Sequence, residues 1–509
     1  MLFGTLLLLV PALMTGHPFI YWDTPTFYSW GHDIVAAVER PWPPLSSFPA
    51  HRGLWAADNM PGAWDTITPE QFQLVLTSIG SRSKFYAVPL YLLGAEFGLW
   101  IPTIAQSALT AGMVWIVYVT VTQRERPAEY VALVAALTLL TSVPFFAAFL
   151  SPDIFAPLGI LAAVMLLCCY ARLTRPRRVA CAVMLCLATL AHLSDFAILL
   201  GVLATVLMLA WGIGSPERLR AGVLVFAAAA ACALCLAALS DVGLEAIFGE
   251  PVRPSPFVEG RVIADGPGET YLREVCGDRH FQACRYKDLK VTTTDDIIWP
   301  DLSWHNLPLI TDPSERRQFL DEQAAVVLGT LERHPIAQVV ASLRNIARQL
   351  ADFRISNDIG ASLTGLLEAH SDRTMRVQQI VPHLKRCRRD PSACDYSGVL
   401  RPLQEGQYVV CALSLLFIAF EMRRSNRIGA FGSADKRRAS VTLVVAILAG
   451  VACNAAVCGA LSGPWPRYQA RVIWLVPMLA ALLALDLLAS KRHPGATGSK
   501  SLPQAGLLA

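Results

Sequence analysis

The sequence predicts an all-α, polytopic membrane protein with about ten transmembrane helices and a mainly helical soluble insertion. Hydrophobic residues make up 54% of the 509 residues, charged residues only 16%, and the mean hydropathy is +0.45. An average soluble domain carries about 25% charged residues. Apolar runs near 20 residues recur along the chain, and basic residues gather between them.

The same composition excludes several other classes of protein. A disordered chain would contain far fewer apolar residues. The net charge of +4 gives no argument for binding nucleic acid, and 13 cysteines are too few for a disulfide scaffold.

The predicted spans divide the chain into four parts. They cover residues 2–20, 101–122, 130–149, 154–170, 179–192, 196–213, 221–240, 406–422, 441–462 and 472–490. The parts are an N-terminal membrane region (1–240) with an outer loop at 21–100, a soluble insertion (241–405), a C-terminal membrane region (406–490) and a polar tail (491–509). The first run lacks a basic start and Ala-x-Ala-like spacing, so we expect an uncleaved helix.

Basic residues predict the orientation of these spans. With ten spans, every short basic loop falls on one side of the membrane. These loops contain Arg124, Arg126, Arg172, Arg175, Arg177, Arg178, Arg218, Arg220, Arg423, Arg424, Arg427, Lys436, Arg437, Arg438, Lys491 and Arg492. By the positive-inside rule this side is the cytoplasm, which also contains both termini. The sequence has no Asn-x-Ser/Thr sequon, which favours a bacterial inner membrane with a periplasmic insertion over a eukaryotic lumen.

Two features of the insertion lead to further expectations. Cys276 and Cys284 form one close pair and Cys387 and Cys394 another. Local disulfides suit an oxidising compartment, and a zinc site is the weaker alternative because no His follows at finger spacing. Residues 336–353 predict an amphipathic helix, which would dock either on the membrane surface or on the core of the insertion. Its predicted apolar face consists of Val339, Val340, Leu343, Ile346, Ala347, Leu350 and Phe353.

Polar residues gather in the outer loops, close to the ends of predicted spans. Asp23 follows the first span, Asp153 lies in a tight turn, and His192 with Asp195 lies in another. Such residues often have a purely structural role, as helix caps or as side chains that hydrogen-bond to the backbone of their own turn. Alternatively, a carboxylate at this depth acts as a general base, and a His–Asp pair binds phosphate or a metal or transfers a proton.

Arginines on the outer side run against the positive-inside trend. Arg467 and Arg471 are four residues apart, so a helix places them on one face, with Tyr468 beside them. Guanidinium groups bind phosphate in a bidentate manner, which favours an anionic head group over a purely structural role. Arg82 precedes a short apolar segment and is a further phosphate ligand, or else an interface anchor.

The acidic loops and the late arginine-bearing loop resemble those of the GT-C superfamily of integral-membrane glycosyltransferases. The resemblance implies sugar transfer from a polyprenyl-phosphate donor to a glycan, lipid or protein acceptor outside the cytoplasm. It implies Asp23 as the base, Asp153 as a second carboxylate and Arg471 as the contact to the donor phosphate. No Asp-x-Asp follows the first span, so a divalent metal cofactor is not assigned.

Two other classes remain open. A lipid or polysaccharide transporter or flippase would place ionisable residues near the membrane midplane, where the predicted spans have almost none. A non-catalytic envelope assembly protein would use its insertion to bind a partner.

Overall fold

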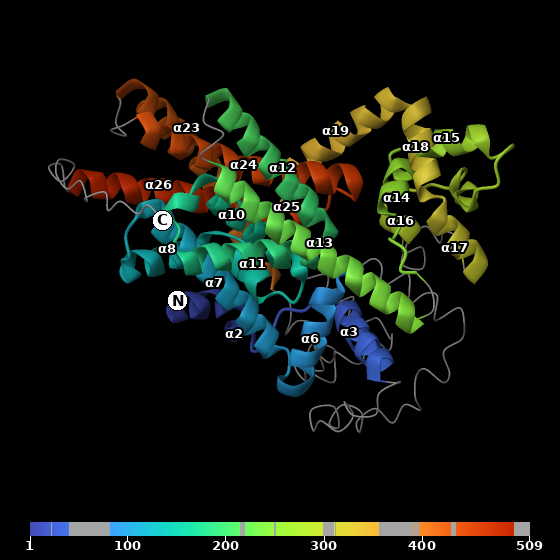
Figure 1. Ribbon diagram of the computed structural model, residues 1–509, viewed down its shortest axis with the longest axis horizontal. Coiled ribbons are helices and arrows are strands. Elements are labelled where there is room, and N and C mark those ends of the chain that lie inside the picture. Colours follow the sequence, from blue (N-terminus) through green and yellow to red (C-terminus); the bar gives the residue numbers. More distant parts are fainter. Residues whose placement is uncertain are drawn as a thin grey trace, which may run out of the picture.

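The computed structural model describes residues 1–21, 23–39, 82–213, 219–248, 251–298, 310, 312–355, 390, 396–428 and 434–492. Within these ranges the regular elements are helical, apart from one isolated bridge between Phe19 and Phe149. The chain forms a helical bundle with the insertion at one end (Figure 1).

The helices before the insertion are α1 (Leu2–Leu8), α2 (Val10–Thr15), α3 (Asp23–Glu39), α6 (Lys84–Phe97), α7 (Trp100–Thr122), α8 (Pro127–Leu140), α9 (Val143–Ala148), the 3-10 turn η2 (Pro152–Ile154), α10 (Phe155–Cys168), α11 (Arg175–Ala191), α12 (Leu193–Ile213) and α13 (Arg220–Phe248). The insertion contains α14 (Phe257–Ala264), α15 (Pro267–Val275), α16 (Asp295–Ile298), α17 (Pro313–Asp321), α18 (Gln323–Arg333) and α19 (Pro335–Ala351). The last helices are α23 (Ser397–Ile428), α24 (Ala434–Leu461), α25 (Pro466–Ile473) and α26 (Leu475–Arg492).

Six described helices are long and apolar enough to cross a membrane: Trp100–Thr122, Ser194–Gly212, Arg220–Ile247, Leu400–Arg424, Ser440–Leu461 and Pro466–Leu488. They support a multi-pass helical membrane protein. The sequence predicted about ten spans. The other four predicted runs, residues 2–20, 130–149, 154–170 and 179–192, form shorter helices.

Local breaks shorten two of these four runs. Run 2–20 divides after Leu8, and Pro11, which has no amide hydrogen, lies in the first turn of α2. Run 130–149 divides at Thr141, whose extended backbone ends α8. The break after Leu8 lies within a continuous apolar stretch, and the small polar pair Thr141 and Ser142 changes the mean hydropathy of its run very little, so apolar composition alone revealed neither break.

Helix α10 lies at the centre of the bundle. Its side chains from Ala156 to Leu167 are all buried, and it packs against α11, α12, α13 and α24. The contact with α11 is very close, since a Cβ atom on Gly159 would lie 2.6 Å from the Cβ of Ala188. This packing fixes the start of α10, where Asp153 lies.

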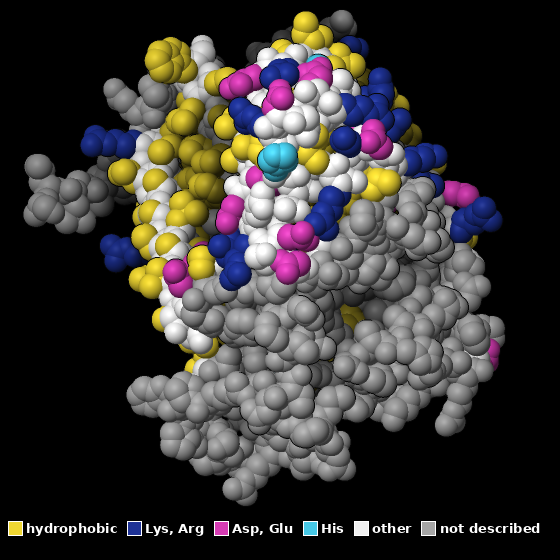
Figure 2. Space-filling view, turned by 90° about the vertical axis from the view of Figure 1, so that its right-hand side faces the viewer, with side chains coloured by type: hydrophobic (Ala, Val, Ile, Leu, Met, Phe, Trp, Pro, Cys, Tyr) yellow, Lys and Arg dark blue, Asp and Glu magenta, His cyan; other side chains and the backbone are white. Residues whose placement is uncertain are grey.

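The insertion has a separate hydrophobic core. Val262, Leu272 and Val326 belong to it, from α14, α15 and α18. A disulfide joins Cys276 to Cys284, with their Cα atoms 5.9 Å apart. Cys387 and Cys394 lie outside the described residues. Charged side chains of both signs cover the insertion, beside a face where hydrophobic side chains predominate (Figure 2).

The amphipathic helix over residues 336–353 corresponds to α19, which packs along α24. Its buried positions are Gln338, Ala341, Asn345 and Gln349. Most of the predicted apolar face is exposed instead, so the expectation of docking through that face on the insertion's core is wrong. The polar residues bind specific partners on the protein side, and these hydrogen bonds decide the orientation.

Candidate functional site

The starts of five helices meet at one group of charged side chains. Asp23 opens α3, Arg82 precedes α6, Asp153 lies in η2 before α10, and Asp195 lies in the first turn of α12. Arg467 lies at the start of α25, and Arg471 lies in its last turn. We call these six residues the arginine–aspartate cluster. Helix starts have a partial positive charge, so their convergence favours an anion.

Ion pairs link the outer members of the cluster. Arg82 pairs with Oδ1 of Asp23. Nη1 of Arg467 lies 3.3 Å from Oδ2 of Asp23 and 3.5 Å from Oδ2 of Asp153. Arg467 therefore joins two carboxylates that are 130 positions apart in the sequence (153 − 23).

Arg471 holds the inner members together. Its Nη1 lies 3.1 Å from Oδ1 of Asp153, and its Nη2 lies 3.5 Å from Oδ1 of Asp195. Nε and Nη2 also donate hydrogen bonds to Oδ1 of Asn454, at 3.2 and 3.0 Å. The Arg471 side chain is only 1% exposed, so its role in this arrangement is to order its neighbours.

Exposure increases towards Asp23 and Arg82. Their side chains are 15% and 14% exposed, and that of Arg467 is 8% exposed, against 5% for Asp153 and 1% for Asp195. A ligand that arrives from solvent therefore meets Arg82 and Arg467 before Arg471. The predicted contact between Arg471 and a donor phosphate would require this buried side chain to rearrange.

Local hydrogen bonds hold the loops in place. The hydroxyl of Ser151 donates to Oδ2 of Asp153 at 2.7 Å, and the hydroxyl of Thr24 donates to the carbonyl of Leu150 at 2.8 Å. These bonds tie α3 to the turn before α10. Asn454 Nδ2 donates to the carbonyl of Tyr468 at 2.6 Å, which ties α24 to α25.

Two predicted accessory residues lie beside the cluster. The ring of Tyr468 lies 5.1 Å from the guanidinium carbon of Arg467 and 5.3 Å from that of Arg471. Such cation–π contacts favour the charged guanidinium groups. Nδ1 of His192 lies 2.7 Å from the hydroxyl of Ser194, so this histidine bonds within its own turn.

The hydrogen-bond network of the cluster is incomplete. Within the described part of the chain, Nε of Arg467 and Oδ2 of Asp195 are buried and have no hydrogen-bond partner. Buried polar atoms are normally satisfied, so such atoms call for an explanation. One explanation is a bound ligand or water molecule that donates to Asp195 Oδ2 or accepts from Arg467 Nε.

Two residues of the site escaped the sequence analysis. Asn454 lies in an apolar span, where a lone amide gave no functional signal. Asp295, at the start of α16 in the insertion, is close enough to Asp23, Arg82 and Arg467 to interact with them electrostatically. Three threonines precede Asp295 and Asp296 in the sequence, and this pattern is typical of an ordinary helix cap.

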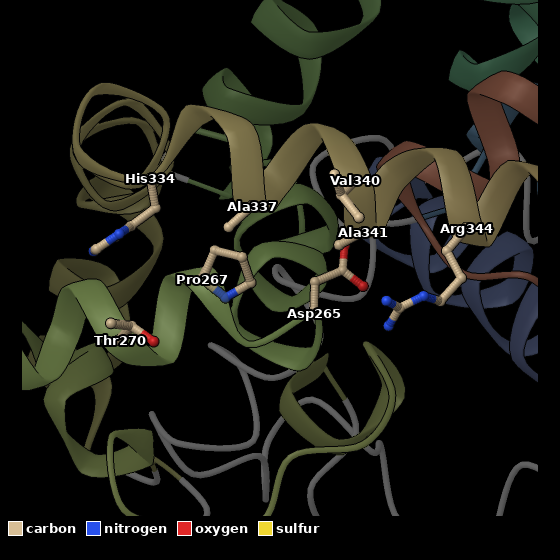
Figure 3. Close-up of a pocket in the computed structure, with 8 residues that line it drawn as sticks. All are labelled: Asp265, Pro267, Thr270, His334, Ala337, Val340, Ala341 and Arg344. Atoms are coloured by element: carbon tan, nitrogen blue, oxygen red, sulfur yellow. The ribbon is translucent and has the colours of Figure 1, made fainter.

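A pocket of about 400 Å³ lies elsewhere, between α19 and the start of α15 (Figure 3). His334 and Arg344 line it together with Asp265. The carboxylate of Asp265 already accepts hydrogen bonds from Gln338 and Asn345, at 3.0 and 2.8 Å, and pairs with Arg261. The pocket therefore offers no free carboxylate.

Among the described residues, no group of three or more His, Cys, Asp or Glu side chains is arranged to hold a metal ion. Comparison of the chain with protein-family models, with curated proteins and with solved structures gave no match. The resemblance to GT-C glycosyltransferases thus depends on the sequence motifs alone.

Proposed function

We propose that the protein is a membrane glycosyltransferase that moves a sugar from a polyprenyl-phosphate donor to a glycan, lipid or protein acceptor. The observation behind this proposal is the arginine–aspartate cluster, in which guanidinium groups and carboxylates meet at converging helix starts. Guanidinium groups bind and stabilise a leaving phosphate, and a carboxylate takes the proton of an acceptor hydroxyl.

In this reaction, the acceptor oxygen forms a bond to the anomeric carbon of the sugar. The bond between that carbon and the phosphate oxygen breaks, and its electron pair stays on the phosphate. Arg82 and Arg467, the most exposed arginines of the cluster, bind the phosphate. Arg471 keeps Asp153 and Asp195 in place behind them.

Asp23 is the base that the resemblance implies. Both of its carboxylate oxygens are paired, one with Arg82 and the other with Arg467. Asp23 can take a proton from the acceptor only after these guanidinium groups move onto the donor phosphate. Donor binding would then activate the base.

The proposal includes the topology expected from the sequence. About ten spans cross a bacterial inner membrane, the shorter helices included, with both termini in the cytoplasm. The cluster and the insertion then face the periplasm, where a lipid-linked sugar is presented. Alkaline phosphatase fused at residue 300 should be active, and a fluorescent protein at the C-terminus should fluoresce. The reverse pattern would contradict this topology.

The function is tested by genetic complementation. A deletion strain should lose a glycan or glycolipid, and the wild-type gene should restore it. Asp23→Asn keeps the size of the side chain but removes its charge, so it should accumulate in the membrane and fail to restore the product. Asp33→Asn is the matched control. Asp33 lies in the same helix and bonds to His32.

Restoration by Asp23→Asn would show that Asp23 is only a helix cap. An unchanged glycan and lipid profile in the deletion strain would contradict the glycosyltransferase proposal itself. Altered distribution of a complete glycolipid between the two leaflets, without loss of a sugar, would favour a flippase instead.

A further inference from the structure

Helix α16 of the insertion is fixed against the loop that leads into α25. The hydroxyl of Thr294, the residue before α16, donates a hydrogen bond to the carbonyl of Ser462. Helix α14 packs on the other side, since a Cβ atom on Gly260 would lie only 3.1 Å from Cγ2 of Thr294. The start of α16 is thus held between α14 and the loop before Arg467.

The turn itself is rigid. Oδ2 of Asp296 accepts hydrogen bonds from the backbone amides of Thr292 and Thr293, at 2.8 and 2.9 Å. Ile297 and Ile298 are buried and anchor the helix. Asp295 lies between these fixed points, so its backbone has little freedom.

Asp295 and Asp23 differ in what binds their carboxylates. Asp23 is paired with two arginines. The half-buried carboxylate of Asp295 makes no hydrogen bond or ion pair with the described residues, yet it interacts electrostatically with Asp23, Arg82, Arg467 and Tyr468. It therefore faces the cluster without being neutralised by it.

We propose that Asp295 of the insertion, rather than Asp23, takes the proton from the acceptor hydroxyl. Asp23 then serves to position Arg82 and Arg467 for the donor phosphate. This inference depends on the proposed function. The carboxylate of Asp295 is not paired with any described arginine, in contrast to that of Asp23, so it can accept a proton wherever Arg82 and Arg467 lie. It also explains a role for the insertion, because α16 supplies the carboxylate that acts as the base.

The electrostatics of Asp295 support this role. Burial, and then the charge of Asp23, raise the pKa of Asp295 to about 6, against the opposing effect of Arg82 and Arg467. A base whose pKa lies close to the working pH is effective in proton transfer. Below about pH 6 the group is neutral. Above it, the negative charge of Asp295 opposes the binding of an anion at the arginines.

This effect can be measured as donor binding, without an acceptor. The probe is a polyprenyl-phosphoryl-glucose, a phosphodiester with constant charge, added to the purified protein in phosphatidylcholine nanodiscs. We expect the affinity of the wild type to fall about threefold to tenfold between about pH 5 and about pH 8, as a unit charge appears near the phosphate. Asp295→Asn should show a clearly smaller fall in affinity over this pH range than the wild type does.

Complementation supplies the second readout. Asp295→Asn should fail to restore the missing product although it binds the donor. Asp288→Asn is the matched control, since the Asp288 side chain is a 68% exposed carboxylate of the same insertion. This control should restore the product and keep the wild-type dependence of binding on pH.

The outcomes separate the two proposals. If Asp295→Asn restores the product, or keeps the pH dependence of the wild type, Asp295 is not the base, and the proposed function stands. If the wild type does not bind the probe at any pH, the proposed function fails and this inference fails with it.

A second, independent inference concerns the exposed face of α19. Large apolar side chains there are exposed, at 80% for Ile336, 54% for Val339, 50% for Val340 and 60% for Leu343. The opposite face is polar and makes hydrogen bonds within the protein: Gln349 donates to the carbonyl of Trp465 at 2.8 Å, and Asn345 donates to Asp265. A helix in water has the reverse arrangement.

The neighbour of α19 identifies what covers this face. α19 packs along α24, and a Cβ atom on Gly459 of α24 would lie 3.0 Å from the backbone of Asn345. Residues 440–461 of α24 form a candidate membrane span. We infer that the apolar face of α19 lies in the lipid of the outer leaflet, with Arg344 and Arg348 near the head groups.

Photo-crosslinking in nanodiscs of phosphatidylethanolamine and phosphatidylglycerol tests this inference. Benzoylphenylalanine replaces Leu343 in one variant and Arg273 in the other; the side chain of Arg273 in α15 is 55% exposed. Position 343 should give several-fold more lipid adduct, detected by mass spectrometry. Equal adducts at both positions, or crosslinks at 343 to protein alone, would overturn the inference.

Discussion

Replacement of Arg471 tests whether this buried side chain holds the carboxylates of the arginine–aspartate cluster in position. Its guanidinium group contacts Asp153 and Asp195 and donates two hydrogen bonds to Asn454. Removing one partner from a buried ion pair costs about 3–5 kcal/mol, because the remaining charge stays buried. Arg471→Met should therefore destabilise the protein by about this amount.

Arg471→Lys retains the charge but loses the fork of donors. A single ammonium group cannot reach both carboxylates and the amide of Asn454 in the geometry of the guanidinium group. A hydrogen bond to a charged group contributes about 1.5–3 kcal/mol. We expect a loss of about 2–4 kcal/mol, visible as a lower thermal midpoint of the detergent-purified protein and less protein in the membrane fraction.

Arg126→Lys is the matched control. The Arg126 side chain is 50% exposed and pairs with Glu129 at 2.9 Å. Exposed pairs contribute less than about 1 kcal/mol, so its thermal midpoint should stay close to that of the wild type. If Arg471→Lys is as stable as Arg126→Lys and binds donor more weakly, Arg471 is a ligand contact and our placement of it as a support is wrong.

Two further predictions concern the insertion. Glu259 is buried, and neither of its carboxylate oxygens has a hydrogen-bond partner among the described residues. Burial raises the pKa of Glu259 well above the ordinary 4.5, and the nearby charge of Glu322 raises it further. The folded state thus keeps a proton that the unfolded chain releases, so the insertion should lose stability as pH rises above about 4.5. Glu259→Gln should remove this loss and increase amide protection in hydrogen exchange at about pH 8, whereas an unchanged exchange pattern would contradict the argument. Mass spectrometry of the non-reduced protein should find Cys276 linked to Cys284 and Cys387 to Cys394, and cross-pairing or free thiols would contradict these assignments.

Much of the cluster could be predicted from the sequence, because counting the predicted spans assigns each loop to one side of the membrane. Once the basic loops were placed on one side, Asp23, Asp153, Asp195, Arg467 and Arg471 all fell on the other. Loops on the same side of a helical bundle can meet, and these do. What counting could not predict was the depth of each residue: the side chain of Arg471 is only 1% exposed, against 8% for Arg467 and 14% for Arg82.

Other features depend on tertiary contacts that no local pattern reveals. Asn454 is one amide in an apolar helix, and its importance appears only when Arg471 lies beside it. Asp295 reads as a helix cap until α16 is docked on the loop before α25. The apolar face of α19 was recognised, but its direction depends on where Asn345 and Gln349 find partners.

The central claim is that Arg82 and Arg467 form the binding site for a lipid-linked phosphate. A cryo-electron microscopy structure with polyprenyl-phosphoryl-glucose in nanodiscs tests it most directly. We expect density for the phosphate within hydrogen-bond distance of both guanidinium groups, which have left Asp23. Phosphate density elsewhere on the protein, with Arg82 and Arg467 still paired to Asp23, would contradict it.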